Sequence, residues 1–124
     1  MSDTFGSTFR EKRRQAGISQ RRLAELAGVD FSYISKIEND RLPAPSAETL
    51  IRLAQHLGCP AEELLAAAQK LPDELGANLS REPAAVRFLQ EASDLALSSE
   101  EWESMRTTLR GLREGRSPRR RRKP

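Results

Sequence analysis

The sequence predicts an all-α protein, on three observations. Apolar residues recur at spacings of three and four, alternating β-branched runs typical of strands are missing, and Gly and Pro separate the periodic stretches. We expect a five-helix domain over residues 1–71, a linker over 72–82, a C-terminal segment of two helices over 83–115 and a disordered basic tail over 116–124.

Five short helices account for the first 71 residues. The first runs from about Thr4 to Ala16, and the next three begin after the N-cap residues Ser19, Asp30 and Ser46. The fifth begins near residue 60 or 61. Helices this short are marginal alone in water, so they must pack together. Their apolar stripes are formed by Phe5 and Phe9; Leu23, Leu26 and Ala27; Ile34 and Ile37; Leu50, Leu53, Ala54 and Leu57; and Leu64, Leu65 and Ala68.

Two further helices are expected after the linker. One starts near Ser80 or Glu82, with Pro83 in its first turn. The pattern Ser98 to Glu101 is a capping box that opens the last helix. That helix carries apolar residues spaced three, four and three, which is typical of a helix–helix seam. The seam either folds back on the first domain or, as we favour, joins two copies in a homodimer; it comprises Trp102, Met105, Leu109 and Leu112.

The charge is distributed unevenly along the chain. Residues 1–41 carry eight basic and six acidic side chains, whereas residues 42–115 carry seven basic and twelve acidic ones. Residues 116–124 carry six basic side chains and no acidic one. This tail has three readings: a solvated segment without a role, an arm that binds phosphates non-specifically, or a segment for partner docking or degradation.

Several classes of protein are disfavoured by what the sequence lacks. No apolar run reaches 18 residues and no secretory signal is visible, which predicts a protein without a membrane contact. The single cysteine, Cys59, fits a reducing compartment, so we expect a cytoplasmic protein, associated with the nucleoid if it binds DNA. His56 and Cys59 alone cannot make a metal site or a nucleophile–base pair, so neither cofactor nor metal nor enzymatic activity is expected.

The segment from Ser19 to Ser46 is the most informative. Two helices flank a tight turn, where Ala24 is a small contact residue, Gly28 supplies the turn and Val29 enters the core. The helix after the turn then directs a short, polar, nearly neutral face outward, which suits the major groove of DNA. That face comprises Phe31, Ser32, Ser35, Lys36 and Asn39.

The same segment resembles a known family. The spaced residues are Ser19-Gln20-x-x-Leu23-Ala24-x-x-Ala27-Gly28-Val29, Tyr33-Ile34-Ser35-x-Ile37-Glu38-Asn39 and Pro45-Ser46-x-x-Thr49-Leu50-x-x-Leu53-Ala54. Together with Phe9-Arg10-x-x-Arg13-x-x-x-Gly17 upstream, they are similar to the lambda-repressor-like (Xre/Cro) helix-turn-helix regulators over about residues 5–70. The resemblance implies a five-helix DNA-binding domain whose third helix, at about 30–39, reads base pairs.

Roles for individual residues follow from the resemblance. It implies that Phe31, Ser32 and Lys36 meet base edges with Ser35 close by, that Gln20, Asn39 and Arg41 contact phosphates, and that Arg13 and Glu38 form an internal salt bridge. Other readings stay open for three of them: Phe31 as a staple against the first helix, Lys36 as a solvated lysine and Gln20 as an ordinary first-turn residue.

Two functions are therefore expected. The first is a sequence-specific regulator that binds double-stranded DNA, a dimeric repressor of an inverted repeat. The second, motivated by the acidic stretch 42–115, is a protein that mainly binds another protein, such as an antitoxin that binds a toxin or a regulator controlled by a protease.

Asp30 and Asp40 depart from the family's usual residues and would lower affinity for DNA if they faced phosphates.

Overall fold

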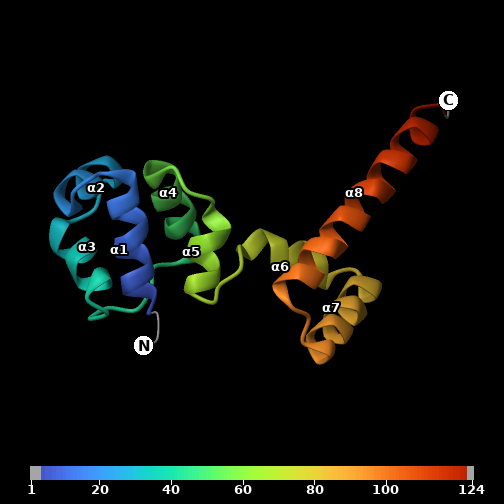
Figure 1. Cartoon of the computed structure of the whole chain (residues 1–124), viewed down its shortest axis with the longest axis horizontal. Coiled ribbons are helices and arrows are strands. Elements are labelled where there is room, and N and C mark those ends of the chain that lie inside the picture. Colours follow the sequence, from blue (N-terminus) through green and yellow to red (C-terminus); the bar gives the residue numbers. More distant parts are fainter. Residues whose placement is uncertain (1–3, 123–124) are drawn as a thin grey trace. The chain divides into compact units, whose positions relative to one another are not determined.

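The computed structural model describes the backbone of residues 4–122 and the side chains of residues 4–115, and all of its regular elements are helices (Figure 1). The chain divides into two units, the first ending at Asn78 and the second beginning at Leu79. The all-α prediction is confirmed. The helices are α1 (Phe5–Ala16), α2 (Gln20–Ala27), α3 (Phe31–Glu38), α4 (Ala47–Leu57), α5 (Ala61–Ala67), α6 (Asp73–Ser80), α7 (Pro83–Leu95) and α8 (Ser99–Arg122).

Local sequence signals set most helix ends in the first unit. The side chains of Thr4, Ser19 and Ser46 accept hydrogen bonds from backbone N–H groups in the first turns of α1, α2 and α4. Asp30 occupies the N-cap position of α3 but makes no capping bond. Its carboxylate instead accepts a hydrogen bond from the Ser32 hydroxyl at 3.2 Å. The N-cap position was therefore predicted correctly, but the hydrogen bond from the side chain to the backbone that a cap normally makes is not formed.

The predicted stripes meet in one core. Helix α1 contacts α3, α4 and α5, and it lies between the α2–α3 pair and the α4–α5 pair in Figure 1. Phe5 stacks on Phe9, with ring centroids 5.7 Å apart. Among the described residues, the large apolar side chains without any exposed surface are those of Phe9, Leu23, Ile34, Ile37, Leu50, Leu53 and Leu64.

Gly6 allows α1 to lie directly against the end of α3. A Cβ atom added at Gly6 would come within 2.5 Å of the Glu38 carbonyl oxygen and 2.6 Å of the Ile37 carbonyl oxygen. Backbone at that distance cannot move aside as a flexible side chain would. The first turn of α1 therefore requires a residue without a side chain.

Most of the stretch predicted as a linker, 72–82, is helical, because α6 runs from Asp73 to Ser80. Pro72 precedes the helix, and its carbonyl accepts hydrogen bonds from the N–H groups of Leu75 and Gly76. Asp73 and Glu74 stand in the first turn, where the helix dipole favours acidic residues. These signals outweigh the low helix propensity of Gly76, which had suggested a loop.

Helix α8 also extends further than expected. We expected disorder from residue 116, but the backbone remains helical as far as Arg122. The rest of that prediction concerns the side chains of 116–124 and the backbone of 123–124, which lie outside the described residues.

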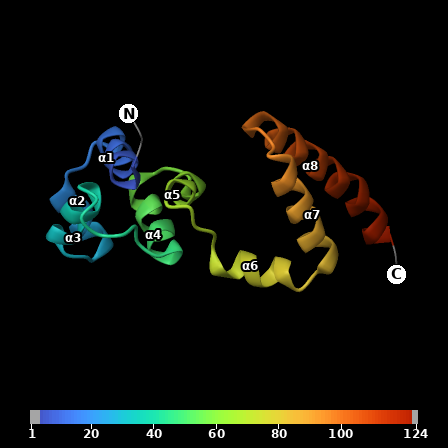
Figure 2. The ribbon, with the colours of Figure 1, turned by 90° about the horizontal axis from the view of Figure 1, so that it is seen from below.

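The second unit has almost no core of its own. The chain reverses direction between α7 and α8 (Figure 2), through Ala96 at φ 52°. Among the described side chains of this unit, only Ala92 is buried. An apolar groove of about 300 Å³ lies between Phe88 of α7 and one face of α8. The apolar residues of α8 that line it are those of the predicted seam, Trp102, Met105, Leu109 and Leu112.

The described part of the chain holds no helix that is both long enough and apolar enough to cross a lipid bilayer.

Replacing Gly6 with Ala should lower the free energy of unfolding by about 1–3 kcal/mol, because the added methyl group overlaps backbone oxygens. Helix propensity alone predicts the opposite sign, since Ala favours a helix over Gly by roughly 0.5–1 kcal/mol. Gly76→Ala is the matched control, because nothing lies within 4 Å of a Cβ atom there. Urea unfolding of both variants measures the difference, and a G6A protein as stable as G76A would contradict the close approach.

Candidate nucleic-acid interface

Helix α3 buries one face and exposes the other. Ile34 and Ile37 have no exposed surface, whereas Phe31 is 37% exposed. The remaining exposed residues of α3 and its C-cap are polar or charged, and Ser35 is half-buried. The predicted outward face is therefore present, with Ser35 at its edge. Its exposed members are Phe31, Ser32, Lys36 and Asn39.

The turn between α2 and α3 fixes the direction of this face. Gly28 adopts a left-handed conformation with φ 70°, which favours glycine. The N–H of Val29 donates to the Ala24 carbonyl at 3.0 Å, and Ala24 is only 4% exposed. A buried small residue and a left-handed turn thus stand where α2 and α3, which contact each other, are joined.

A buried carboxylate joins three helices behind the exposed face. The Glu38 side chain of α3 has no exposed surface, and its Oε2 accepts a hydrogen bond from Arg13 Nε of α1 at 2.5 Å. Its Oε1 accepts from Gln20 Nε2 of α2 at 2.8 Å and from Arg10 Nε of α1 at 3.4 Å. The predicted Arg13–Glu38 pair is thus an ion pair of this structure, within a larger network.

The network also sets the charge state of Glu38. Burial raises the pKa of this carboxyl, but hydrogen bonds from Arg13, Gln20 and Arg10, together with the charge of Arg13, lower it. The net result is a pKa below the ordinary value of 4.5. Glu38 is therefore ionised at neutral pH and holds its partners by charged hydrogen bonds.

Two of the residues expected at phosphates are engaged by this network. The Gln20 side-chain amide donates a hydrogen bond to Glu38, and Gln20 is half-buried. Asn39 is exposed, and its Oδ1 accepts from an Arg10 guanidinium nitrogen at 2.9 Å. Arg41, the third, is exposed in the loop after α3. The structure thus links Gln20 and Asn39 through Glu38 and Arg10, and Arg10 had no predicted role.

Phe31 is covered by an arginine that the sequence did not single out. The Arg21 guanidinium carbon lies 4.5 Å from the centroid of the Phe31 ring, a cation–π contact between the first turns of α2 and α3. The ring remains 37% exposed and contacts α2, whereas the alternative of a staple would have placed it against α1.

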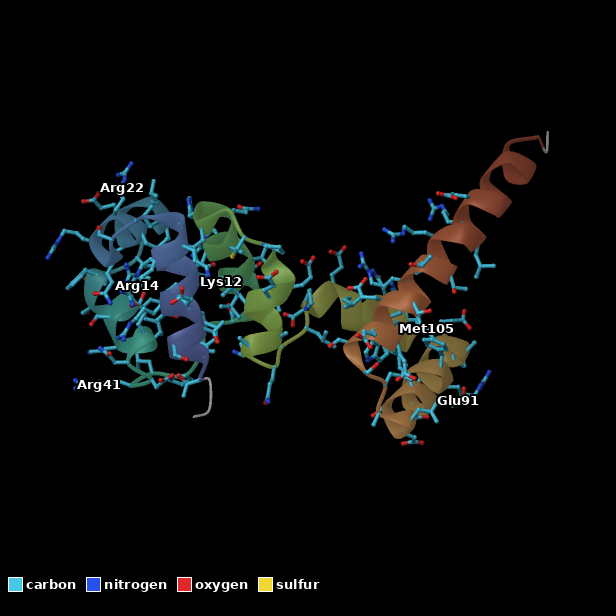
Figure 3. The ribbon with its side chains drawn as sticks, viewed as in Figure 1. Lys12, Arg14, Arg22, Arg41, Glu91 and Met105 are labelled. Carbon is cyan, nitrogen blue, oxygen red and sulfur yellow. The ribbon has the colours of Figure 1, made fainter. Side chains whose placement is uncertain are left out.

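Basic side chains flank α3. Figure 3 shows Arg22 and Arg41 on opposite sides of this helix, one from α2 and the other from the loop after α3. Arg22 pairs with Glu25 at 3.2 Å, but both side chains are about 60% exposed, and such surface pairs contribute little. The polar face of α3 therefore lies between two exposed cations.

Asp40 is exposed, but its carboxylate binds the start of α1. Its Oδ1 accepts the Gly6 N–H at 2.9 Å and its Oδ2 accepts the Thr4 hydroxyl at 2.7 Å. A carboxylate at a helix N-terminus is stabilised by the helix dipole. The predicted repulsion between Asp40 and phosphates is therefore weakened, because this charge is already partnered.

With this geometry established, residues 9–64 match the family model HTH_3, helix-turn-helix. The matched stretch contains α2, α3 and the turn between them. Residues 9–64 form a helix-turn-helix domain of this family. The resemblance inferred from the spaced motif is confirmed.

Curated relatives share this domain. The uncharacterized HTH-type transcriptional regulator RghRB of Bacillus subtilis is 39% identical over 74 residues, which cover 57% of this chain and 53% of the relative. The HTH-type transcriptional regulator PuuR of Escherichia coli is 42% identical over 69 residues, which cover 56% of this chain and 36% of the relative. The chain thus spans about half the length of the first relative and about a third of the second.

Among solved structures, the chain is similar to SinR, the master regulator for biofilm formation, in complex with DNA. The identity is 34% and the TM-score 0.47, over 50% of this chain and 98% of that one.

Sequence reasoning missed three contributors to this helix-turn-helix domain. Arg10 and Arg21 lie in recognisable positions, but a sequence does not show which of several arginines reaches a ring or a carboxylate. Asp40 has a left-handed backbone, with φ 58°, and its contact with the start of α1 joins residues 34 apart in the sequence. The exposed aromatic Phe31 was the one signal that pointed to a nearby cation.

Glu38 predicts how stability depends on pH. Because its pKa is lower in the folded protein than in the unfolded chain, its ionised form stabilises the fold above about pH 4.5, and this contribution is lost as the pH falls through the folded pKa. Glu38→Gln should cost about 3 kcal/mol at pH 7, as for a broken buried pair. That cost should shrink as the pH is lowered.

Urea unfolding between pH 7 and pH 3 measures this change. Glu11→Gln, at an exposed position of α1, is the matched control and should follow the wild-type curve. Parallel pH curves for the wild type and E38Q would contradict the assigned role of Glu38.

Proposed function

We propose that this protein is a sequence-specific regulator of transcription that binds double-stranded DNA by placing α3 in the major groove. The exposed face of α3 carries the proposal, because its polar side chains stand on a helix whose other face is fixed in the core. Such preorganisation lowers the entropy cost of binding. The names of the relatives, HTH-type transcriptional regulators, agree with this role and suggest no enzymatic activity.

Base readout is assigned to the exposed face and its edge. Lys36 donates to guanine O6 and N7, and Phe31 packs on a thymine methyl group. Ser32 donates or accepts at a base edge, and Ser35 supplements it from its half-buried position. Both hydroxyls are short, so they act only where the helix approaches the bases closely.

Phosphate contacts are assigned to Gln20, Asn39 and Arg41 at the rim of this face. Arg41 is exposed and supplies a full positive charge. Gln20 and Asn39 are anchored through Glu38 and Arg10, so they reach phosphates from positions fixed by the core. Phosphate contacts of this kind set the register of the helix on the duplex.

The second unit is proposed to form a homodimer. A unit of this size with one buried side chain among those described lacks the core needed for stability by itself, and small domains commonly gain buried surface by oligomerisation. Trp102 and Met105 are each 39% exposed, and Leu109 and Leu112 are more than 60% exposed. A second copy of this face would cover them. The dimer would present two copies of α3 to an inverted repeat with half-sites about 34 Å apart, and repression follows if that repeat overlaps a promoter.

Selection of bound fragments from random duplexes should yield one site bound at least ~10³ times more tightly than random DNA. Lys36→Ala should relax the choice of base at one position of each half-site, at a cost of about 1–3 kcal/mol. Arg41→Ala should weaken all duplexes alike and lower the slope of log affinity against log salt by about one. Failure to enrich any sequence would refute the proposal.

Leu109→Glu should convert the dimer to a monomer, because it places a charge in the apolar groove. Sedimentation equilibrium should give twice the 13.9 kDa chain mass for the wild type and a single mass for the variant. Thr107→Glu adds the same charge on the other side of α8 and should remain dimeric. A wild-type monomer would instead favour the second candidate, in which this exposed groove binds a partner protein such as a toxin or protease.

A further inference from the structure

Arg21 and Phe31 form a pair that the proposed contacts do not use as a unit. They come from the first turns of α2 and α3, and the guanidinium carbon lies 4.5 Å from the ring centroid. Both residues are exposed. An arginine plane stacked on a ring is restricted in orientation while its N–H donors stay available at the edge.

The charge of Arg21 is not part of an ion pair among the described residues. Among the described residues, no carboxylate lies within ion-pair distance of Arg21. The two nearest acids in sequence have other partners, since Glu25 pairs with Arg22 and Asp30 accepts from Ser32. The donors of Arg21 are therefore free to meet an acceptor outside the protein.

We propose that Arg21 and Phe31 act as one reading unit for two neighbouring base pairs, a guanine read by Arg21 and a thymine read by Phe31. The ring packs on the thymine 5-methyl group, and the guanidinium donates to guanine O6 and N7. This inference rests on the proposed DNA-binding function and adds a specificity-determining residue, Arg21, to it.

The spacing explains why the two bases are neighbours. The guanidinium carbon and the ring centroid are 4.5 Å apart, a distance of the same order as the rise of about 3.4 Å between successive base pairs. A base contacted by one group therefore leaves the adjacent base pair within reach of the other. Each side chain restrains the other, so removing either should weaken both readings.

The test uses the duplex selected by the wild-type protein and two modified versions of it. In each version one base is replaced by an analogue that lacks a single contact group. Uracil in place of the thymine removes only the methyl group and should weaken wild-type binding about three- to fivefold. Replacing the guanine with 7-deazaguanine removes the N7 acceptor and should weaken it by at least about fivefold. Affinities are measured by fluorescence anisotropy at one salt concentration.

Protein variants then show which side chain is responsible for the loss of affinity caused by each base analogue, called here the uracil penalty and the 7-deazaguanine penalty. Phe31→Ala should abolish the uracil penalty, and Arg21→Ala should abolish the 7-deazaguanine penalty and reduce the uracil penalty as well. Arg21→Lys keeps the charge without the planar fork, so it should retain affinity for random DNA and still lose the 7-deazaguanine penalty. Arg22→Ala removes the same charge one residue along α2 and should leave both penalties at their wild-type values.

The outcomes separate this inference from the proposed function. If Arg21→Ala weakens all duplexes alike and keeps both penalties, Arg21 is a phosphate contact and the reading unit is overturned. Selected sites without a neighbouring guanine and thymine would overturn it too, although specific binding would stand. If no duplex is selected at all, the proposed function itself fails.

Discussion

The buried carboxylate of Glu38 is the constraint on which the first unit depends. A charge without exposed surface is stable only when it is fully partnered, and its partners here come from α1 and α2. Satisfying it therefore fixes the positions of three helices at once. It also fixes residues outside the core, because Arg10 contacts both Glu38 and Asn39. The exposed face of α3 is thus held in place by a charge that lies directly behind it.

The two units follow different principles. In the first, small residues and closely packed apolar side chains let five short helices form a core. In the second, two longer helices meet with Ala92 as the only buried side chain among those described, and the larger apolar side chains face outward. The first unit has the properties of a folded domain, whereas the second leaves its larger apolar side chains exposed. This contrast is the basis for the proposal that the first unit binds DNA and the second joins two copies of the chain.

Local signals explain which features could be predicted. The caps at Ser19 and Ser46, the turn at Gly28 and the apolar stripes depend on residues a few positions apart, and the sequence displays them directly. The spaced motif predicted the helix-turn-helix family for the same reason. Helix α6 was missed because Gly76 and Asn78 suggest a loop, while the effect of Pro72 and two acids depends on the backbone that follows.

Contacts between distant residues could not be predicted. Nothing in the sequence distinguishes Arg21, which stacks on Phe31, from Arg22, which pairs with Glu25, although the two are adjacent. The Arg13–Glu38 salt bridge could be predicted only because the family resemblance implied it. The long-range choice among equivalent side chains is decided by helix packing, which a single sequence does not contain.

Position 40 combines two demands that are usually met separately. Its backbone has a left-handed conformation, which glycine adopts without strain, and its side chain neutralises the start of α1, which glycine cannot do. Aspartate accepts some strain in exchange for the charge. A residue without the carboxylate at position 40 would therefore loosen the loop after α3 and the beginning of α1 together.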